Sequence, residues 1–349
     1  MIRKLIFTRT IATVLLIACS GPTVFAQVAT LNVVSFNIRG AFFGTDPVDS
    51  WVWLNINNPS DYFAGPHRRD RAISIIRSAA PDIMGIQELK PGQRDDLLAA
   101  FPEYRYVGRG RDTTGNDDSN GIFFRASRFA LLDQGEFWLS STPTIPGTTF
   151  TGNGSDIGNP RMASWVKLRD QLSNDSYFVM STHWSLDSLA RRQSAELIQS
   201  FLPSLSAGLP ILMIGDLNSS SSSTEYRTLR DLTTTTGVDL ADAFVNGGGV
   251  DGRTFHNYAG GTSGTRIDHV LYTAGPNSPF TPTSASILRN TYNGGLYPSD
   301  HYPVQVRFNV AIPELSSGTL LGFSLGGVMG TRLFLLGIRA RRRGRNNRG

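Results

Sequence analysis

Polar residues of catalytic type stand where the apolar runs of this sequence stop. Asn37 follows Val33-Val34-Ser35-Phe36, and Glu88 and His183 follow similar runs at 83–87 and 178–182. The pattern recurs with Asp216 and Asn218 after 211–215, with Asp268 after Arg266, and with Asp300-His301 just before Pro303-Val304. A single carboxylate after an apolar run is usually a solvated strand end. The recurrence predicts that strand ends bring these side chains together at one sheet edge.

These residue types suit the hydrolysis of a phosphate ester. The ester is anionic and resists water, so catalysis needs a hard cation on the phosphate oxygens, an oriented nucleophile and help for the leaving oxygen. Carboxylate and amide oxygens are the ligands that Mg²⁺ prefers. The only cysteine is Cys19, near the N-terminus, which argues against a structural zinc site.

Six short motifs in order resemble the endonuclease/exonuclease/phosphatase family of DNase I-like proteins. They are Ser35-Phe36-Asn37, Pro81-Asp82-Ile83 through Gln87-Glu88, Ser181-Thr182-His183, Gly215-Asp216-Leu217-Asn218, Arg266-Ile267-Asp268 and Ser299-Asp300-His301. The resemblance covers about residues 30–310. It implies an α/β fold, a four-layer α/β sandwich of two mixed β-sheets flanked by helices. Trp184 and Ser185 follow His183, where many members of the family carry a Leu and a polar residue. This difference leaves open which subgroup of the family the chain resembles.

The resemblance also implies a role for each residue. Glu88 would be the principal metal ligand, with Asn37 and Asp300 completing the shell of Mg²⁺, or of Mn²⁺ or Ca²⁺, partly through water. Asp216 and Asn218 would orient or deprotonate the attacking water. His301, held by Asp268, and His183 would hydrogen-bond the phosphate and stabilise charge in the transition state. Arg161 would add a phosphate contact, although an ordinary salt bridge explains it equally well.

Strand and helix patterns alternate along one domain without repeats. Short β-branched and aromatic runs predict strands at 31–36, 83–86, 104–107, 121–124, 137–139, 164–168, 177–181, 211–214, 267–272 and 304–310. Helical spacing appears at 72–80 before Pro81, again around 186–202, and in a short segment at 224–232. The mixture suggests stacked sheets with helices outside. The stretches 142–160 and 245–265 read as long loops, which are often functional.

The remaining histidines and a group of aromatic residues can be explained by structural roles outside the candidate site. His269 adjoins Asp268 but points to the opposite strand face, so we expect it to pack. His256 and His67 stand in expected loops and read as plain polar residues. Trp51, Trp53, Tyr62 and Phe63 lie in the loop 39–66. They either pack within that loop or form an aromatic wall that stacks on a base or touches lipid.

The two ends of the chain predict export. Arg3, Lys4 and Arg9 precede an apolar run, and Val24-Phe25-Ala26 resembles a cleavage site, so we expect a signal peptide at 1–26. The alternative is a lipobox that makes Cys19 a lipidated first residue. After a catalytic domain at 27–311, the segment 312–349 resembles a PEP-CTERM sorting tail, with Pro313-Glu314, an apolar stretch and an Arg-rich end. Leu315 replaces the second Pro, and a basic disordered tail is the alternative.

The distribution of charge bears on the substrate. Ten of the 33 basic residues lie in the first 26 and last 18 residues, so the stretch between holds 23 bases against 28 acids. The net negative charge of this stretch gives little support to broad electrostatic binding of nucleic acid. A substrate groove could still be lined in part by Arg105, Arg109, Arg111 and Arg125. Nucleic acid, a sugar phosphate and a phospholipid head group all remain open as substrates. We expect a monomer, secreted or held at a bacterial surface or in the periplasm, with transient membrane anchoring by the tail. An inactive binding module is the competing hypothesis.

Overall fold

The computed structural model describes residues 27–41, 50–52, 67–150, 158–230, 237–275, 277–292 and 294–312. Two six-stranded mixed sheets lie face to face. The proposed signal peptide and sorting tail, together with Trp53, Tyr62 and Phe63, lie outside these residues. Within the described part of the chain, no helix is long and apolar enough to cross a membrane.

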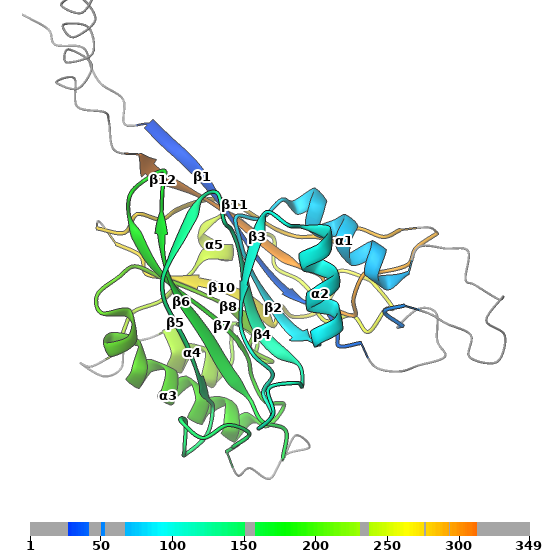
Figure 1. The fold of residues 1–349 in the computed structure, drawn as a ribbon, viewed down its shortest axis with the longest axis horizontal. Helices are drawn as coiled ribbons and strands as arrows, with labels where there is room; N and C mark the ends of the chain where they lie inside the picture. The colour runs from blue at the N-terminus through cyan, green and yellow to red at the C-terminus, as the bar shows by residue number, and fades with distance from the viewer. Residues whose placement is uncertain are drawn as a thin grey trace, which may run out of the picture.

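The first sheet begins the domain and ends it. Its strand order is β11 (Thr281–Ile287), β12 (Val304–Ile312), β1 (Gln27–Asn37), β2 (Ile83–Leu89), β4 (Ser119–Arg125) and β3 (Tyr104–Val107). β1 runs parallel to β2 and antiparallel to β12. The two ends of the folded domain therefore lie side by side (Figure 1).

The second sheet is built mainly from the middle of the chain. Its order is β5 (Phe129–Trp138), β6 (Met162–Asp170), β7 (Ser176–His183), β8 (Ile211–Asp216), β10 (Asp268–Tyr272) and β9 (Ala241–Asp242). β7 and β8 are parallel, whereas β6 and β10 run antiparallel to them. Each of the ten predicted strands overlaps an observed strand, although the one predicted at 137–139 shares only its first two residues with β5. β9 and β11 were not predicted from the sequence.

Helices cover the outer faces of the two sheets. α1 (Arg68–Ala79) and α2 (Pro91–Ala100) lie on one flank, and α3 (Ser188–Ser206) and α4 (Thr224–Arg230) lie on the other (Figure 1). A short helix, α5 (Ala243–Asn246), follows β9. α1 ends where Ala80 adopts a left-handed conformation before Pro81. The sequence predicted a helix that ends before Pro81, but the helix begins at Arg68, four residues before the predicted segment. Together these layers confirm the predicted four-layer α/β sandwich.

Three hydrophobic cores separate the four layers, and the alternation of side chains along the strands creates them. In β1, Leu31 and Val33 enter the core between the sheets, while Val34 and Phe36 enter the core beneath α1 and α2. The third core joins the second sheet to α3 and α4. A strand buried on both faces reads as a continuous apolar run, which explains the runs in the sequence.

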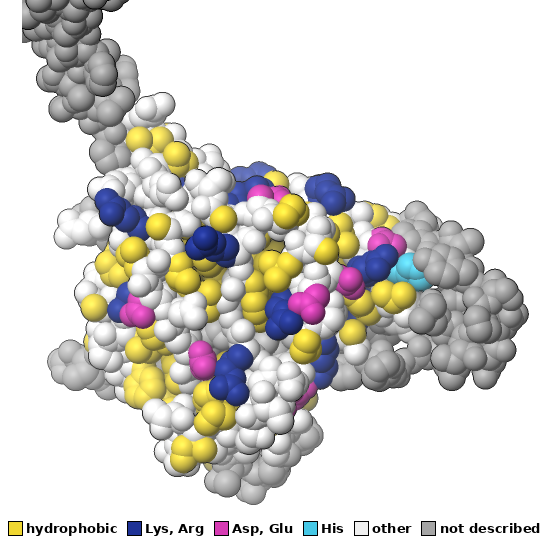
Figure 2. Space-filling view, viewed as in Figure 1, with side chains coloured by type: hydrophobic (Ala, Val, Ile, Leu, Met, Phe, Trp, Pro, Cys, Tyr) yellow, Lys and Arg dark blue, Asp and Glu magenta, His cyan; other side chains and the backbone are white. Residues whose placement is uncertain are grey.

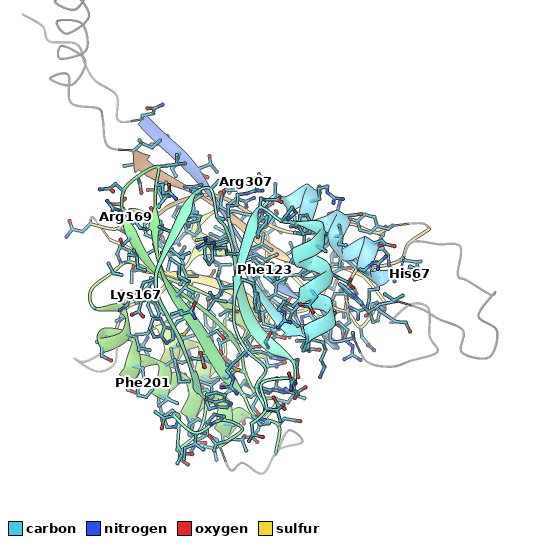
Figure 3. The ribbon with its side chains drawn as sticks, viewed as in Figure 1. His67, Phe123, Lys167, Arg169, Phe201 and Arg307 are labelled. Atoms are coloured by element: carbon cyan, nitrogen blue, oxygen red, sulfur yellow. The ribbon has the colours of Figure 1, made fainter. Side chains whose placement is uncertain are left out.

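The helix flanks separate two of the residues labelled in Figure 3. His67 lies at the start of α1, on the flank that also carries α2, whereas Phe201 belongs to α3 on the opposite flank (Figure 3). His67 is buried, and its backbone carbonyl accepts the N–H groups of Asp70 and Arg71 in the first helical turn. Trp51 is buried as well and donates a hydrogen bond from Nε1 to Asp96 at 2.8 Å. Packing is therefore the observed role of Trp51.

The two sheets approach each other closely at Gly85 in β2. A Cβ atom at this position would lie 2.6 Å from Cγ2 of Ile214 in β8 and 3.1 Å from Oγ of Ser181 in β7. Both neighbours are buried, so neither side chain can swing into solvent. The close contact therefore requires a residue without a side chain at this point.

We predict that Gly85→Ala lowers the free energy of unfolding by about 1–3 kcal/mol, because the added methyl group must push the sheets apart. Urea denaturation of the purified domain measures the change. Gly92→Ala in α2 is the matched control, since no described atom lies within 4 Å of its added Cβ atom. The control should be neutral or slightly stabilising. Equal midpoints for both variants would mean that Gly85 is not a contact between the sheets.

Candidate active site

The strand directions bring the predicted site residues to one end of the sandwich. The parallel strands β1 and β2 end at Asn37 and next to Glu88, and the parallel strands β7 and β8 end at His183 and Asp216. The antiparallel strands start at this same end: Asp268 opens β10 opposite Asp216, and Asp300-His301 precede β12. Arg161 likewise precedes β6. All nine predicted site residues therefore lie at one edge shared by both sheets.

Asn37 links the two sheets at this edge. Its Nδ2 donates hydrogen bonds of 3.0 Å to Oε1 of Glu88 and 3.0 Å to Oδ2 of Asp216. Its Oδ1 accepts the backbone N–H of Arg39 at 3.0 Å. In this orientation the amide joins two carboxylates instead of offering its oxygen to a cation, so the predicted role of Asn37 as a metal ligand would require the amide to turn.

Glu88 and Asp300 form a pair of acidic side chains beside Asn37. Burial alone would raise the pKa of Glu88, but the hydrogen bond from Asn37 and the positive charge of His301 lower it below its usual value. Burial raises the pKa of Asp300, and the negative charge of Glu88 raises it further. Arg39 lies 3.7 Å from Asp300, measured from Nε to Oδ2. This environment would stabilise a cation held between the carboxylates.

His301 is bonded to Asp268 as the resemblance implied. Its Nδ1 lies 2.9 Å from Oδ2 of Asp268, and its Nε2 lies 3.7 Å from Oδ2 of Asp216. Burial opposes a charge on the imidazole, but the two carboxylates outweigh it and raise the pKa of His301 to about 10. His301 is therefore a buried cation at neutral pH. A cationic imidazole can donate a hydrogen bond to an anionic oxygen.

Asp216 shares the pocket with these charges. Burial, reinforced by the negative charge of Asp268, raises the pKa of Asp216 to about 7, although His301 and Asn37 oppose the shift. The backbone N–H of Asn218 donates to Oδ1 at 2.9 Å, which leaves Oδ2 facing Asn37 and the two histidines. A carboxyl group with a pKa near neutrality can accept a proton from water during turnover.

His183 and Asn218 form a further hydrogen-bonded pair. Nδ2 of Asn218 donates to the carbonyl of Trp184 at 2.9 Å, which fixes the orientation of the amide. The same Nδ2 lies 3.1 Å from Nε2 of His183, so this imidazole nitrogen accepts. Burial lowers the pKa of His183 well below its usual range, with Arg161 and Arg111 adding to the effect. His183 is therefore neutral, and Nδ1 carries its proton.

Three residues at this edge adopt backbone conformations that side chains normally disfavour. Arg39, Glu88 and Asn218 have φ values of 61°, 60° and 47°. Such residues cost free energy and persist where the surrounding structure holds them. Glu88 is held by two hydrogen bonds, from Asn37 and from the backbone N–H of Gly40 at 3.2 Å. Two of the three, Glu88 and Asn218, are among the predicted site residues, whereas Arg39 was not predicted.

Asp216, Asp268 and His301 also form the group of described residues that could itself hold a metal ion, because their ligand atoms lie within 4.8 Å of one another. While His301 is protonated, however, its imidazole has no lone pair for a metal, and its hydrogen bond occupies one carboxylate oxygen of Asp268. Glu88 and Asp300 lie beside this group and offer further carboxylate oxygens. The arrangement therefore offers carboxylate oxygens to a cation and a cationic imidazole to an anion within one site.

Sequence reasoning missed several residues that hold the site together. Ser299 Oγ donates to the carbonyl of Asn37 at 2.7 Å and accepts the N–H of His301 at 3.1 Å. Thr254 Oγ1 accepts the backbone N–H groups of Ile267 and Asp268 at 3.0 and 3.3 Å. Ser299 stands inside a motif and could have been suspected. Thr254 gives no signal beyond lying in a long loop.

His269 supports the loop after β8. Nδ1 lies 2.7 Å from Nη1 of Arg266, which can only donate, and Nε2 donates to the carbonyl of Ser219 at 2.8 Å. Arg266 is fully buried and also bonds Asp242. His269 therefore packs as expected, and it also belongs to a polar network that holds Ser219, the residue after Asn218.

Comparison with known proteins agrees with this geometry. The family described as the Endonuclease/Exonuclease/phosphatase family matches residues 34–301, and the chain therefore belongs to it. The uncharacterized protein L388 of Acanthamoeba polyphaga mimivirus is 24% identical over 258 residues, which cover 69% of this chain and 91% of that protein.

Two solved structures from Bacteroides thetaiotaomicron are similar. An endonuclease/exonuclease/phosphatase family protein has 27% identity and a TM-score of 0.66, covering 82% of this chain and 100% of that one. A mannosyl-6-phosphatase has 28% identity and a TM-score of 0.63, covering 80% of this chain and 99% of that one. The family and these neighbours indicate a hydrolase of phosphate esters.

We predict that His269 makes the fold sensitive to acid. Burial, with the charge of Arg266, lowers the pKa of His269 to about 4. The imidazole of an unfolded chain titrates near 6.5, so below that pH the unfolded state binds a proton that the native state does not. Between pH 7 and pH 5 this difference should remove about 2 kcal/mol of stability.

His269→Gln provides the comparison, because Gln keeps one donor and one acceptor but does not titrate. The free energy of unfolding, measured by urea denaturation with chelator at each pH, should fall less steeply for the variant. The difference in free energy of unfolding between the wild type and the variant cancels the pH dependence that His301 and His256 contribute to both proteins. Parallel pH profiles would contradict the assignment.

Proposed function

We propose that this protein is a divalent-metal-dependent phosphatase that acts on a small phosphate ester, with a sugar phosphate as the favoured substrate class. The observation that carries the proposal is the double hydrogen bond of Asn37, which ties Glu88 and Asp216 into one site. Glu88 and Asp300 supply the hard oxygen donors that Mg²⁺ prefers, and Mn²⁺ or Ca²⁺ would also fit such donors.

The residues of the chain divide the work of hydrolysis. Glu88 and Asp300 would hold the cation, which would supply Lewis-acid polarisation of the phosphate. His301 donates a hydrogen bond to a phosphate oxygen and stabilises its growing charge, with Asp268 holding the imidazole in place. Asp216 and Asn218 orient the attacking water, and Asp216 accepts its proton. His183 and Arg161 contact the phosphate from the second sheet.

The charges outside the site favour a small substrate over a nucleic acid. Of the four arginines that could line a groove, three lie next to acids. Arg109 lies 3.9 Å from Glu136, Arg111 lies 3.0 Å from Asp117, and Arg125 lies 3.8 Å from Glu103. On the face shown in Figure 2, basic side chains are dispersed among acidic and apolar ones. The similarity to the mannosyl-6-phosphatase supports the same choice.

We predict that Glu88→Gln and His301→Ala each lower turnover at least a hundredfold, because each removes charge that meets the phosphate or its cation. Hydrolysis of mannose 6-phosphate with Mg²⁺ measures the loss, and circular dichroism checks the fold. Glu103→Gln is the matched control, since this exposed carboxylate lies beside Arg125 at the end of the first sheet opposite Glu88. Excess chelator should abolish activity, and added Mg²⁺ should restore it.

The same assay tests the substrate and the competing hypothesis. Mannose 6-phosphate should be hydrolysed faster than single-stranded DNA, double-stranded DNA or sphingomyelin. Faster cleavage of either DNA would replace the phosphatase by a nuclease. Full activity in excess chelator, or in both variants, would reject the mechanism. No turnover of any of these esters would favour a binding module without catalysis.

We propose further that the domain is exported as a monomer and that the tail anchors it transiently at a membrane. β1 starts at Gln27 and pairs with Ile312, so cleavage after Ala26 and processing beyond residue 312 would both leave the first sheet intact. Mass spectrometry of the exported protein should find Gln27 at the N-terminus and no Arg-rich tail. A lipidated Cys19 at the N-terminus would establish the lipoprotein alternative instead.

A further inference from the structure

Phe255 is an exposed aromatic residue that lies against the candidate catalytic histidine. Its side chain is 45% exposed, and it is the only aromatic residue among the exposed large hydrophobic residues of the described chain. Its ring centroid lies 5.0 Å from that of His301 at an interplanar angle of 53°. An exposed phenyl ring is unfavourable in water, so its place beside a reactive group calls for an explanation.

The backbone around Phe255 is fixed to the site. Phe255 forms an antiparallel bridge with His301, and the N–H groups of His256 and Asn257 both donate to the carbonyl of Asp300, at 2.8 and 3.2 Å. Thr254 accepts the N–H of Tyr302 at 2.9 Å. The segment 254–257 is therefore held at several points along the residues that carry the candidate metal ligand and the catalytic imidazole.

Side chains alternate in exposure along this segment. Thr254 and His256 are buried, and the ring of His256 stacks on Tyr302 at 3.9 Å. Phe255 and Asn257 are exposed. The fixed backbone thus presents one apolar ring and one amide to solvent at the edge of the site.

We propose that Phe255 and Asn257 form the subsite for the leaving alcohol, and that this alcohol is a hydroxylated ring such as a sugar. The inference rests on the proposed phosphatase function and names what lies beyond the phosphate. The C–H face of a sugar ring packs on an aromatic ring, and an amide offers both a donor and an acceptor for ring hydroxyls. Neither side chain carries a charge, which suits a neutral alcohol better than a second phosphate.

The competing explanation is that Phe255 only shields His301 from water. The two explanations differ in how the loss of the ring should act on different substrates. A shield protects the imidazole whatever alcohol is attached to the phosphate. A subsite contributes only when the alcohol is large enough to reach it.

The experiment compares Phe255→Ala with the wild type on two esters, mannose 6-phosphate and methyl phosphate, in the full chain with Mg²⁺. We expect kcat/KM for mannose 6-phosphate to fall roughly three- to tenfold more than kcat/KM for methyl phosphate. Inhibition by free mannose should weaken by a similar factor, whereas inhibition by inorganic phosphate should change less. Asn257→Gly, which tolerates the φ of 46° at this position, should show the same selective loss for mannose 6-phosphate. Phe255→Tyr should keep the wild-type ratio of the two kcat/KM values.

Val250→Ala is the matched control, because Val250 is 84% exposed on the same loop. It should leave both esters and both inhibitors unaffected. Equal losses of kcat/KM for the two esters in Phe255→Ala would overturn the subsite and leave the phosphatase intact. A wild-type enzyme that hydrolyses methyl phosphate but not mannose 6-phosphate would overturn it as well. A wild type inactive on both would reject the proposed function and the subsite with it.

Discussion

The buried carboxylate of Asp216 is the point on which the rest of the site depends. It is 1% exposed, and its Oδ2 faces the amide of Asn37 from the first sheet together with the imidazoles of His183 and His301. A buried charge without partners would cost several kcal/mol. The two sheets must therefore meet with these side chains in place. The same packing of the two sheets that forms the sandwich therefore also assembles the site.

The hydrophobic layers offset the free-energy cost of this arrangement. Glu88 and Asp300 bring like charges together, and Glu88 and Asn218 also adopt left-handed backbone conformations. Each of these features is unfavourable in a stable fold. Three apolar cores lie behind the site, on both faces of each sheet. A site of this kind needs rigid strand ends, because flexible loops would let the carboxylates move apart.

The sequence predicted most of the fold because strands buried on both faces leave continuous apolar runs. It predicted that the candidate site residues gather at one sheet edge, because strands that start or stop at one edge place polar residues at the ends of those runs. β11 escaped detection because Thr281–Ile287 lies at a sheet edge, is mostly exposed and carries Pro282 at a bulge. Thr254 and Phe255 escaped because their contacts come from tertiary pairing with residues more than ten positions away, which no local pattern encodes.

The loop between α5 and β10 explains how this scaffold can acquire selectivity without disturbing catalysis. The loop leads into β10 of the second sheet, but its residue Phe255 pairs with His301, which precedes β12 of the first sheet. Its buried side chains hold the candidate catalytic residues, while its exposed side chains face solvent beside them. In the proposed subsite, substitution of the exposed positions would therefore change what is recognised beyond the phosphate, while Thr254 continues to fix the backbone of Asp268.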